Sequence, residues 1–416
     1  MSYGVGLRNG VAFSLGTISS LTLGGGPRPS LVLNFLSGTL DPRITFSRAT
    51  VGTYYDSSGI LQTAAINEPR FDYNPVTLAA RGLLIEEQRT NLLLQSNDFA
   101  TTWTPISVSI EQNSTLSPDG TVNADTVAAT ATAVGSRIQQ NVVVSTTSQY
   151  VYSCYVRPGT VNTVSLSLYN NTTATALATV NFNVLTGVVV TTTVGSGTIT
   201  PEANGWYRCV VTHSGTVTAT NSIRAYVYPN NTSCTTGDSV IVYGAQLEAG
   251  AFPTSYIPTT VIAAPRNADS ASITTLTPWY NTVAGTWYAA FQTTWDGNAN
   301  QSRAVIIGEN ASKRYLYIGS GQSLITSFDG VSILSPASGD VTGTSAKVAS
   351  TYNATARTIT NNAVAVASGT IAAGYSTPNL IQIGNISSGN YLCGWVSAVR
   401  YYPTALPNAS LQSITA

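Results

Sequence analysis

The sequence predicts an all-β protein with two antiparallel β-sandwiches, preceded by an extended N-terminal arm and a small β-rich collar. Three observations lead to this prediction. Thr, Ser, Val, Asn and Ala fill much of the 416-residue chain beside 35 Gly and 18 Pro, a mix that favours strands and turns over helices. Short segments of alternating apolar and polar residues recur between turn signals. Apolar residues reach 43%, which is enough to bury large cores.

The predicted arm comprises residues 1–30, which are rich in Gly, Ser and Leu and end in a Gly/Pro-rich run. Because this stretch has no core of its own, we expect it to be ordered only against a partner or the rest of the chain. A floppy terminus is the alternative. The predicted collar, residues 31–95, is the most charged part of the chain. Strand-like runs such as Ile44–Phe46 and Leu83–Ile85 lie between its turn signals. Its alternating Arg and acidic residues indicate buried or interface ion pairs, because a guanidinium binds a carboxylate through two hydrogen bonds.

The first predicted sandwich spans residues 96–260. Its alternating segments are Arg137–Val144, Tyr150–Val156, Thr163–Tyr169, Ala178–Val184, Trp206–His213, Ile223–Tyr228 and Ser239–Leu247. About eight short strands over such a length predict an antiparallel sandwich of the jelly-roll type.

The second predicted sandwich spans residues 261–416, after a linker marked by Pro253, Pro258 and Pro265. Its strand segments are Thr286–Thr293, Ala304–Gly308, Tyr315–Ile318, Leu324–Phe328, Lys347–Tyr352, Leu380–Ile383 and Gly394–Tyr401. Helix is expected only at Pro407–Ile414, where Asn408 is the candidate cap.

The charge pattern argues against several classes of partner. The 18 basic residues balance the 18 acidic ones, and only 9% of residues are charged, against about 25% in ordinary domains. A neutral chain without a basic patch disfavours nucleic acid, and no polybasic segment is available for an anionic membrane. No apolar run reaches the roughly 18 residues of a membrane-spanning helix, so no membrane insertion is expected. The first 30 residues are apolar but carry only Arg8 and are interrupted by glycines, which does not match the usual pattern of a signal peptide.

Two long, ordered groups of motifs carry a family resemblance. The first comprises Ile44–Thr50, Tyr54–Asp56, Pro69–Tyr73 and Arg81–Leu93, and the second comprises Gly244–Gly250 and Pro253–Thr260. Together they resemble structural proteins of tailed bacteriophages that form head-spike fibres, tail fibres or minor tail proteins. In that family the stretch between the motifs resembles a jelly-roll carbohydrate-binding module. The C-terminal segments Gly394–Tyr402 and Thr404–Pro407 resemble the end of a concanavalin/laminin-G-like sandwich, although Ala409 and Ser410 stand where acidic residues are usual.

The resemblance implies a virion structural protein on the exterior of head or tail, assembled in the host cytoplasm. It implies a homo-oligomer, with a trimer favoured, that contacts other virion proteins and adheres to host surface polysaccharide. The charged collar is the candidate contact with subunits or virion, since ion pairs there would fix register. The residues expected to make this contact are Arg48, Arg70, Arg81, Glu86 and Glu87.

Catalysis is not expected. Glycoside cleavage needs two carboxylates about 5–10 Å apart on one substrate, but Glu86 and Glu87 point to opposite faces of a strand. The single histidine, His213, has no identifiable partner, and no GxSxG motif occurs. Two alternatives to an adhesive virion protein stay open: a glycan-degrading spike enzyme, and a purely structural capsid decoration protein without a ligand.

No cofactor is expected. Four scattered Cys without a CxxC do not indicate a zinc cluster; Cys154 and Cys209 are either free buried thiols or, if their strands pair, a disulfide. Oxygen ligands of Asp119, Asn123 and Asp125 at alternating spacing are compatible with a structural Ca²⁺, and an ordinary polar turn is the alternative.

Aromatic side chains are the candidate carbohydrate contacts. Sugars pack their C–H faces on aromatic rings and bind amides and carboxylates at the rim. In the first sandwich Tyr226 and Tyr228 alternate on one strand and share a face, and Trp206 lies in the same domain. These three residues form the predicted stacking surface, and core packing is the alternative for each.

Overall fold

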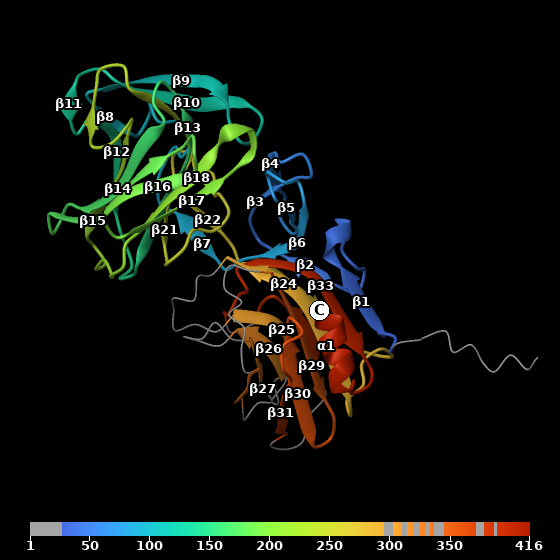
Figure 1. Cartoon of the computed structure of the whole chain (residues 1–416). Coiled ribbons are helices and arrows are strands. Elements are labelled where there is room, and N and C mark those ends of the chain that lie inside the picture. Colours follow the sequence, from blue (N-terminus) through green and yellow to red (C-terminus); the bar gives the residue numbers. More distant parts are fainter. Residues whose placement is uncertain are drawn as a thin grey trace, which may run out of the picture.

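The structure is a computed structural model that describes residues 27–294, 303–309, 314–318, 325–328, 333–336, 345–371, 378–386 and 389–416. Of the predicted arm, residues 1–26 lie outside the described residues. Among the described residues 52% are in strands and 4% in helices, so the predicted all-β class is confirmed. The strands form two β-sandwiches, which appear as two lobes in Figure 1.

The first lobe consists of two six-stranded antiparallel sheets. Sheet I has the order β17-β18-β13-β21-β10-β9, and its strands are β9 (Val108–Leu116), β10 (Val122–Ala129), β13 (Tyr150–Pro158), β17 (Ser196–Pro201), β18 (Tyr207–Thr212) and β21 (Ser239–Ala249). Sheet II has the order β16-β15-β14-β19-β12-β8, and its strands are β8 (Thr104–Ile106), β12 (Arg137–Val143), β14 (Thr163–Asn170), β15 (Thr175–Asn183), β16 (Val188–Val194) and β19 (Ser222–Tyr228). A small ladder pairs β11 (Ala133–Val134) with β20 (Ser233–Cys234).

Alternation along these strands builds the core of the first lobe. Leu166 and Leu168 of β14 and Val227 of β19 point inward from sheet II, and Cys154 and Val156 of β13 meet them from sheet I. All five are fully buried, as the period of two in their segments predicts.

The second lobe takes strands from both ends of the described chain. Sheet III has the order β31-β30-β29-β24-β33-β6-β5, with β1 also paired to β33; its strands are β1 (Leu31–Asn34), β5 (Phe71–Tyr73), β6 (Ala80–Ile85), β24 (Gly285–Thr293), β29 (Ser345–Tyr352), β30 (Ala356–Asn361), β31 (Ala367–Thr370) and β33 (Gly394–Tyr402). Sheet IV has the order β2-β23-β32-β25-β26-β27-β28; its strands are β2 (Thr45–Ser47), β23 (Ser270–Ile273), β25 (Arg303–Glu309), β26 (Arg314–Ile318), β27 (Ile325–Phe328), β28 (Ile333–Leu334) and β32 (Leu380–Ile383).

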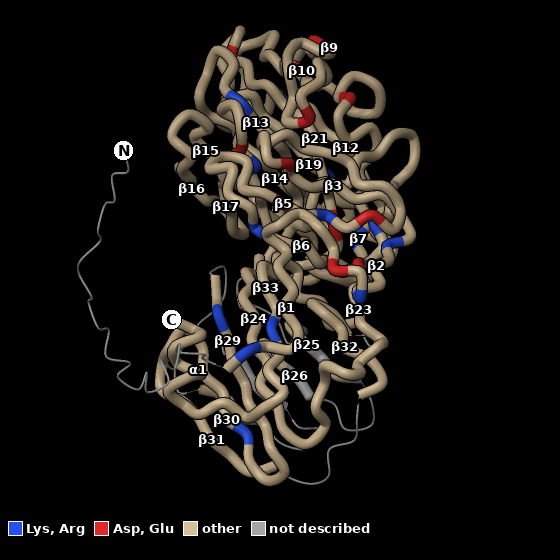
Figure 2. The backbone as a smooth tube through the Cα atoms, turned by 90° about the vertical axis from the view of Figure 1, so that its right-hand side faces the viewer, with Lys and Arg blue, Asp and Glu red and all other residues tan. Residues whose placement is uncertain are grey.

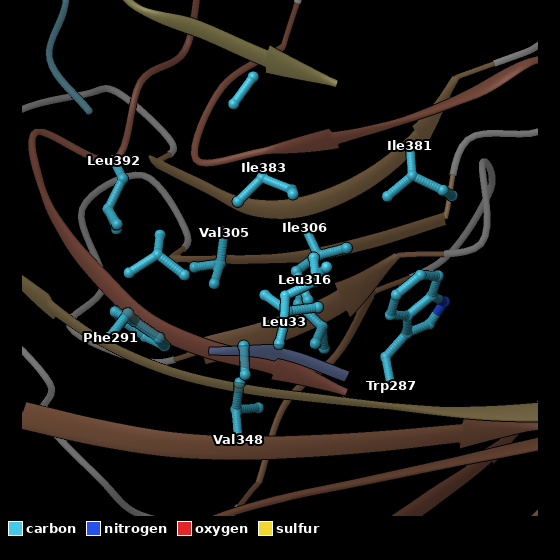
Figure 3. Packing of buried hydrophobic residues seen from close by; sticks show 14 of the residues in the cluster. Leu33, Trp287, Phe291, Val305, Ile306, Leu316, Val348, Ile381, Ile383 and Leu392 are labelled. Carbon is cyan, nitrogen blue, oxygen red and sulfur yellow. The ribbon is translucent and has the colours of Figure 1, made fainter. Parts of the chain in front are cut away.

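The first lobe is therefore inserted between two parts of the second. Residues 31–95 were predicted to form a separate collar, whereas β1, β2, β5 and β6 of that segment extend the two sheets of the second lobe. The reason is burial: Leu83 and Ile85 of β6, and Leu33 of β1, need an apolar partner, which β33 and the sheet facing it provide. Figure 3 shows Leu33 among Val305, Ile306 and Leu316 of sheet IV and Val348 of sheet III.

Helices are short, as expected. They are the 3₁₀ turns η1 (Phe35–Ser37) and η2 (Ala203–Gly205) and the C-terminal α1 (Asn408–Thr415). The predicted helix at Pro407–Ile414 is confirmed, but its cap is corrected: Pro407 is the N-cap residue and Asn408 is already the first helical residue. Within the described residues, no helix has the length and apolar character to cross a membrane.

Two small ladders lie where the lobes meet. They pair β3 (Gly52–Tyr55) with β4 (Leu61–Ala64), and β7 (Arg89–Asn91) with β22 (Ala264–Arg266). Figure 2 shows that Arg, Lys, Asp and Glu gather about this middle part, around β7 and β2, and are sparse on most of the tube elsewhere.

Candidate functional site

The outer face of sheet II carries the predicted tyrosines. Ile223, Ala225 and Val227 of β19 point into the core, so the alternate residues Tyr226 and Tyr228 point away from it. Tyr169 of β14 joins them, with its ring centroid 6.4 Å from that of Tyr226. The rings of Tyr226 and Tyr228 lie 5.7 Å apart in an edge-to-face arrangement. The structure thus brings two of the three predicted stacking residues together.

Two arginines cover these rings. The Cζ atom of Arg137 on β12 lies 4.9 Å from the Tyr226 ring and 6.0 Å from the Tyr228 ring, and Arg224 of β19 lies 5.8 Å from the Tyr226 ring. Tyr226 and Tyr228 are only 7% and 9% exposed. Burial raises the pKa of Tyr228 to about 12, although Arg137 lowers it, so the phenol stays neutral. The two tyrosines therefore support the guanidinium groups, and their ring faces are largely covered.

Amide side chains stand beside the arginines at adjacent register positions. Asn141 pairs with Arg224 across β12 and β19, and its Oδ1 accepts a hydrogen bond from Arg224 Nε at 2.5 Å. Arg137 Nε donates to Gln139 Oε1 at 2.9 Å. On β15, Asn181 Nδ2 donates to Thr191 Oγ1 at 2.7 Å. These planar polar groups are held in place by strands, and each is partly or fully exposed.

Two polar atoms of this face have no hydrogen-bond partner in the protein. Ser165 lies opposite Tyr228 on one side and Asn181 on the other, and its hydroxyl is buried and unpaired. Asn181 Oδ1 is also buried and unpaired. Since buried polar atoms nearly always have partners, both atoms keep hydrogen-bonding capacity that the protein itself does not satisfy. We call Arg137, Gln139, Asn141, Tyr169, Asn181 and Arg224, with Tyr226 and Tyr228 beneath them, the tyrosine face.

The arginines and amides of this face are not among the site residues predicted from the sequence. A signal for them was present, because Arg137, Gln139 and Asn141 alternate within a segment predicted as a strand. Nothing in the sequence indicated that this strand lies next to β19.

Trp206 lies elsewhere. It is 1% exposed, at the end of η2 on the outer side of sheet I, where it packs against Tyr243 at 6.5 Å. Arg157 covers it at 5.4 Å. The core of the first lobe separates it from the tyrosine face, so the predicted three-residue surface does not form as one unit.

The arginines of the predicted collar contact are used inside the chain. Arg48 Nη1 pairs with Asp269 Oδ1 at 3.1 Å, and Arg70 bridges Asp269 at 2.5 Å and Glu86 at 2.8 Å. Arg266 binds Glu86 at 3.0 Å. Burial raises the pKa of Glu86, but Arg266 and Arg70 outweigh it and hold that pKa at about 2. We call these five residues the buried ion network.

This network corrects the subunit-contact prediction for three residues. Arg48, Arg70 and Glu86 are 1%, 0% and 5% exposed within one chain, so they have no surface to offer a neighbour. Arg81 and Glu87 keep partial exposure, with Arg81 3.5 Å from Asp72 and Glu87 paired to Arg89. For these two the contact stays a prediction.

The two motif groups that carry the sequence resemblance meet at the same place. The side chain of Asn91 donates to the carbonyl oxygens of Ala245 and Ile257 and accepts from the backbone of Leu247. The Glu86 carboxylate accepts from the backbone and hydroxyl of Ser255. The motifs therefore join the inserted lobe to the other lobe.

The remaining candidate residues have structural partners. Asp119 accepts from Ser117, Thr121, Asn123 and Tyr243, and Asp125 accepts from two backbone amides. No cluster of three His, Cys, Asp or Glu that could hold a metal occurs among the described residues.

The predicted cysteine pair is juxtaposed without a bond. Cys154 and Cys209 lie directly opposite each other on β13 and β18 as buried free thiols.

The single histidine has a backbone partner. His213 Nδ1 lies 3.1 Å from the carbonyl oxygen of Leu177.

Comparisons with known proteins give only distant likenesses. No protein-family model matches the chain, and no curated protein matches it. Among solved structures, the CBM40 module of Ruminococcus gnavus IT-sialidase bound to α2,3-sialyllactose is 17% identical, with 33% of this chain and 84% of that chain covered and a TM-score of 0.28. Domain 4 of AbnA, a GH43 extracellular arabinanase from Geobacillus stearothermophilus, in complex with arabinotriose, is 12% identical, with 40% and 84% covered and a TM-score of 0.28.

Mouse laminin α1 chain domains LG4–5 are 12% identical over 66% of this chain and 90% of that chain, with a TM-score of 0.23. At such TM-scores these likenesses carry no argument about what the chain binds.

Proposed function

We propose that the chain is a bacteriophage virion structural protein that binds host surface polysaccharide, without cleaving it, on the tyrosine face. The observation that carries the binding role is the arrangement of two guanidinium groups and three carboxamides around three tyrosines on one sheet face. Guanidinium and carboxamide groups match the hydroxyl pairs of sugars through planar sets of donors and acceptors. Stacking on tyrosine holds the long arginine side chains in one conformation, which lowers the entropy cost of binding.

Tyr169 supplies the aromatic contact in this proposal. It is partly exposed, unlike Tyr226 and Tyr228, and it lies opposite Arg224 in the strand register. Tyr169, Arg224 and Asn141 lie side by side across three adjacent strands. A sugar ring packed on Tyr169 would therefore place its hydroxyl groups beside Arg224 and Asn141. The virion role rests on the two motif groups of the sequence, and so do the homo-oligomer, favoured as a trimer, and the location on the outside of head or tail.

The binding role is tested with the full chain and purified host surface polysaccharide by titration calorimetry. Tyr169→Ala and Asn141→Ala should each weaken binding about ten- to a hundredfold, equivalent to about 1–3 kcal/mol, without lowering the unfolding temperature. Val143→Ala is the matched control, because Val143 is 68% exposed at the end of the same strand and outside the tyrosine face. Equal binding by all three variants would refute the site.

The remaining parts of the proposal have separate tests. Gold-labelled antibody against the chain should mark the outside of intact virions, and analytical ultracentrifugation should find an oligomer. Unlabelled particles would refute the virion role. Release of reducing ends from the polysaccharide would overturn binding without cleavage.

A further inference from the structure

A second polar site lies where the two lobes meet, on the opposite side of the first lobe from the tyrosine face. A cavity of about 280 Å³ lies there. On one side it is lined by the outer face of sheet I, through Tyr155 and Arg208, and by Glu202 at the start of η2. On the other side it is lined by Tyr55, Asp72 and Arg81 of β3, β5 and β6, and by Trp395 of β33.

Three buried polar atoms in this cavity have no hydrogen-bond partner in the protein. They are Tyr55 Oη, Glu202 Oε2 and Arg208 Nε. Tyr55 and Glu202 are only 8% and 9% exposed, so bulk solvent does not supply their partners. Tyr55 lies close enough to Glu202 and to Tyr155 for each to shift its pKa, but Tyr55 Oη and Glu202 Oε2 make no hydrogen bond of acceptable geometry with any protein group. Three such atoms converging on one cavity indicate a polar occupant.

The occupant must offer both donors and acceptors. Arg208 Nε donates, Tyr55 Oη can donate or accept, and a carboxyl oxygen of Glu202 accepts when ionised. Burial raises the pKa of Glu202 to about 7, against the lowering effects of Tyr55, Arg208 and Arg81. Near neutral pH this carboxyl is present in both forms. Hydroxyl groups fit this set because each donates and accepts.

The charges around the cavity balance, which disfavours an ionic occupant. Asp72 lies 3.5 Å from Arg81 and accepts from Trp395 Nε1 at 2.7 Å. Arg208 lies 5.4 Å from the Tyr155 ring on the same wall as Glu202. Glu86 also lines the cavity, but its carboxylate is paired with Arg70 and Arg266 of the buried ion network. The two remaining carboxyl groups, of Asp72 and Glu202, thus face the guanidinium groups of Arg81 and Arg208. A phosphate would meet both carboxyls, and an amine would meet both guanidinium groups.

Size and access limit the occupant further. Ligand pockets are commonly about 300–1,000 Å³, so this cavity suits one small ring and not an oligomer. Exposed Thr198 and Thr200 of the edge strand β17 also line it, and therefore it reaches the surface along that strand.

We propose that the cavity between the lobes binds one neutral, hydroxyl-rich ring, such as a single sugar residue, through Glu202, Tyr55 and Arg208. The aromatic walls of Tyr155 and Trp395 enclose the ring. The inference goes beyond polysaccharide binding at the tyrosine face, because it depends on different residues and on the joint between the lobes.

The test is ligand-observed saturation-transfer NMR with the full chain. The neutral probes are galactose, glucose, mannose, rhamnose and N-acetylglucosamine, and the charged probes are glucuronate and glucosamine. At least one neutral sugar should bind, and Thr198→Trp should abolish its signal by filling the entrance. Ser196→Trp is the matched control, because Ser196 lies on the same exposed face of β17 but outside the cavity lining. Binding by no neutral probe, or by charged probes alone, would overturn the proposal.

A second variant separates ligand binding from a structural role. Tyr55→Phe removes an unpartnered buried hydroxyl, so the unfolding temperature should stay the same or rise while affinity for the sugar falls about tenfold. A fall in unfolding temperature with unchanged affinity would assign the hydroxyl to the fold and overturn the proposal. Tyr169→Ala should leave the cavity signal intact. Loss of all neutral-sugar signal in Tyr169→Ala would instead place the binding on the tyrosine face, leaving the proposed function standing and this inference refuted.

Discussion

Glu202 gives the fold a pH dependence that one isosteric substitution should remove. Its pKa is raised by burial from 4.5 to about 7. A carboxyl whose pKa is higher in the folded state holds its proton more tightly there than in the unfolded chain. Stability is therefore full below pH 4.5 and declines as pH rises through 7. Each pH unit between the two pKa values is worth about 1.4 kcal/mol, so ionising Glu202 costs the folded state about 3 kcal/mol.

Glu202→Gln keeps the size of the side chain and removes the charge. At pH 5 the variant and the wild type should unfold at similar temperatures, because Glu202 is then protonated. At pH 8.5 the variant should be more stable by up to about 3 kcal/mol, or roughly 6–12 °C for a domain of this size. The assay is differential scanning calorimetry of both proteins in a pH series from 5 to 8.5.

Glu86→Gln is the matched control with the opposite sign. The pKa of Glu86 is held at about 2, so its ionised form stabilises the fold above pH 4.5, and this contribution disappears as pH falls towards 2. Glu86→Gln should therefore lower the unfolding temperature at neutral pH. A difference between Glu202→Gln and the wild type that does not widen with pH, or a less stable variant at pH 8.5, would refute the reasoning.

Three further substitutions test the packing. Asp269→Ala leaves Arg48 and Arg70 without their shared carboxylate and should cost about 3–5 kcal/mol by urea unfolding; a loss below about 1 kcal/mol would contradict the buried ion network. Trp206→Ala should also cost about 3–5 kcal/mol while polysaccharide binding stays unchanged, and weakened binding in a stable variant would return Trp206 to the ligand site. Gly82 has a φ of +110°, and an added Cβ would lie 2.3 Å from the Val396 carbonyl oxygen, so Gly82→Ala should strongly destabilise the second lobe. Gly237→Ala in the first lobe is the control with a smaller expected loss, because Gly237 also has a positive φ but its Cβ would meet nothing within 4 Å. Equal unfolding temperatures for the two glycine variants would show that β6 does not pack closely on β33.

Local alternation predicted most strands well. Tyr150–Val156 became β13 and Ile223–Tyr228 became β19, because each has one face in a core and the other outside it. The edge strand β16 was not predicted, since its residues Val188–Thr193 are exposed on both faces and show no alternation. An edge strand has a neighbouring strand on one side only and is less buried, so its sequence shows weaker alternation of apolar and polar residues.

Long-range pairing was beyond the sequence. The ion pairs of Arg48 and Arg70 were expected from their charge, but their partner Asp269 lies beyond the inserted lobe and no local pattern links them. Glu202 has no local sequence signal of a special role, because its burial comes from packing near Tyr55 of β3. The shared face of Tyr226 and Tyr228 was predicted correctly. The arginines above them were not predicted as site residues, because Arg137 comes from the neighbouring strand β12 and Arg224 of β19 carried no signal beyond that of a strand.

The insertion of the first lobe into the second has a consequence for synthesis on the ribosome. Leu31 pairs with Tyr401, and Leu83 pairs with Val396. The early strands β1 and β6 can therefore pair with β33 only after nearly the whole chain has been synthesised. The inserted lobe contains all the strands of its two sheets and can close while the rest is still being translated. A chain that stops before β33 would leave β1, β6 and β24 with unpaired edges, which invite aggregation or proteolysis. The topology thus acts as a check on completeness, since the second lobe can close only in a chain that extends through β33.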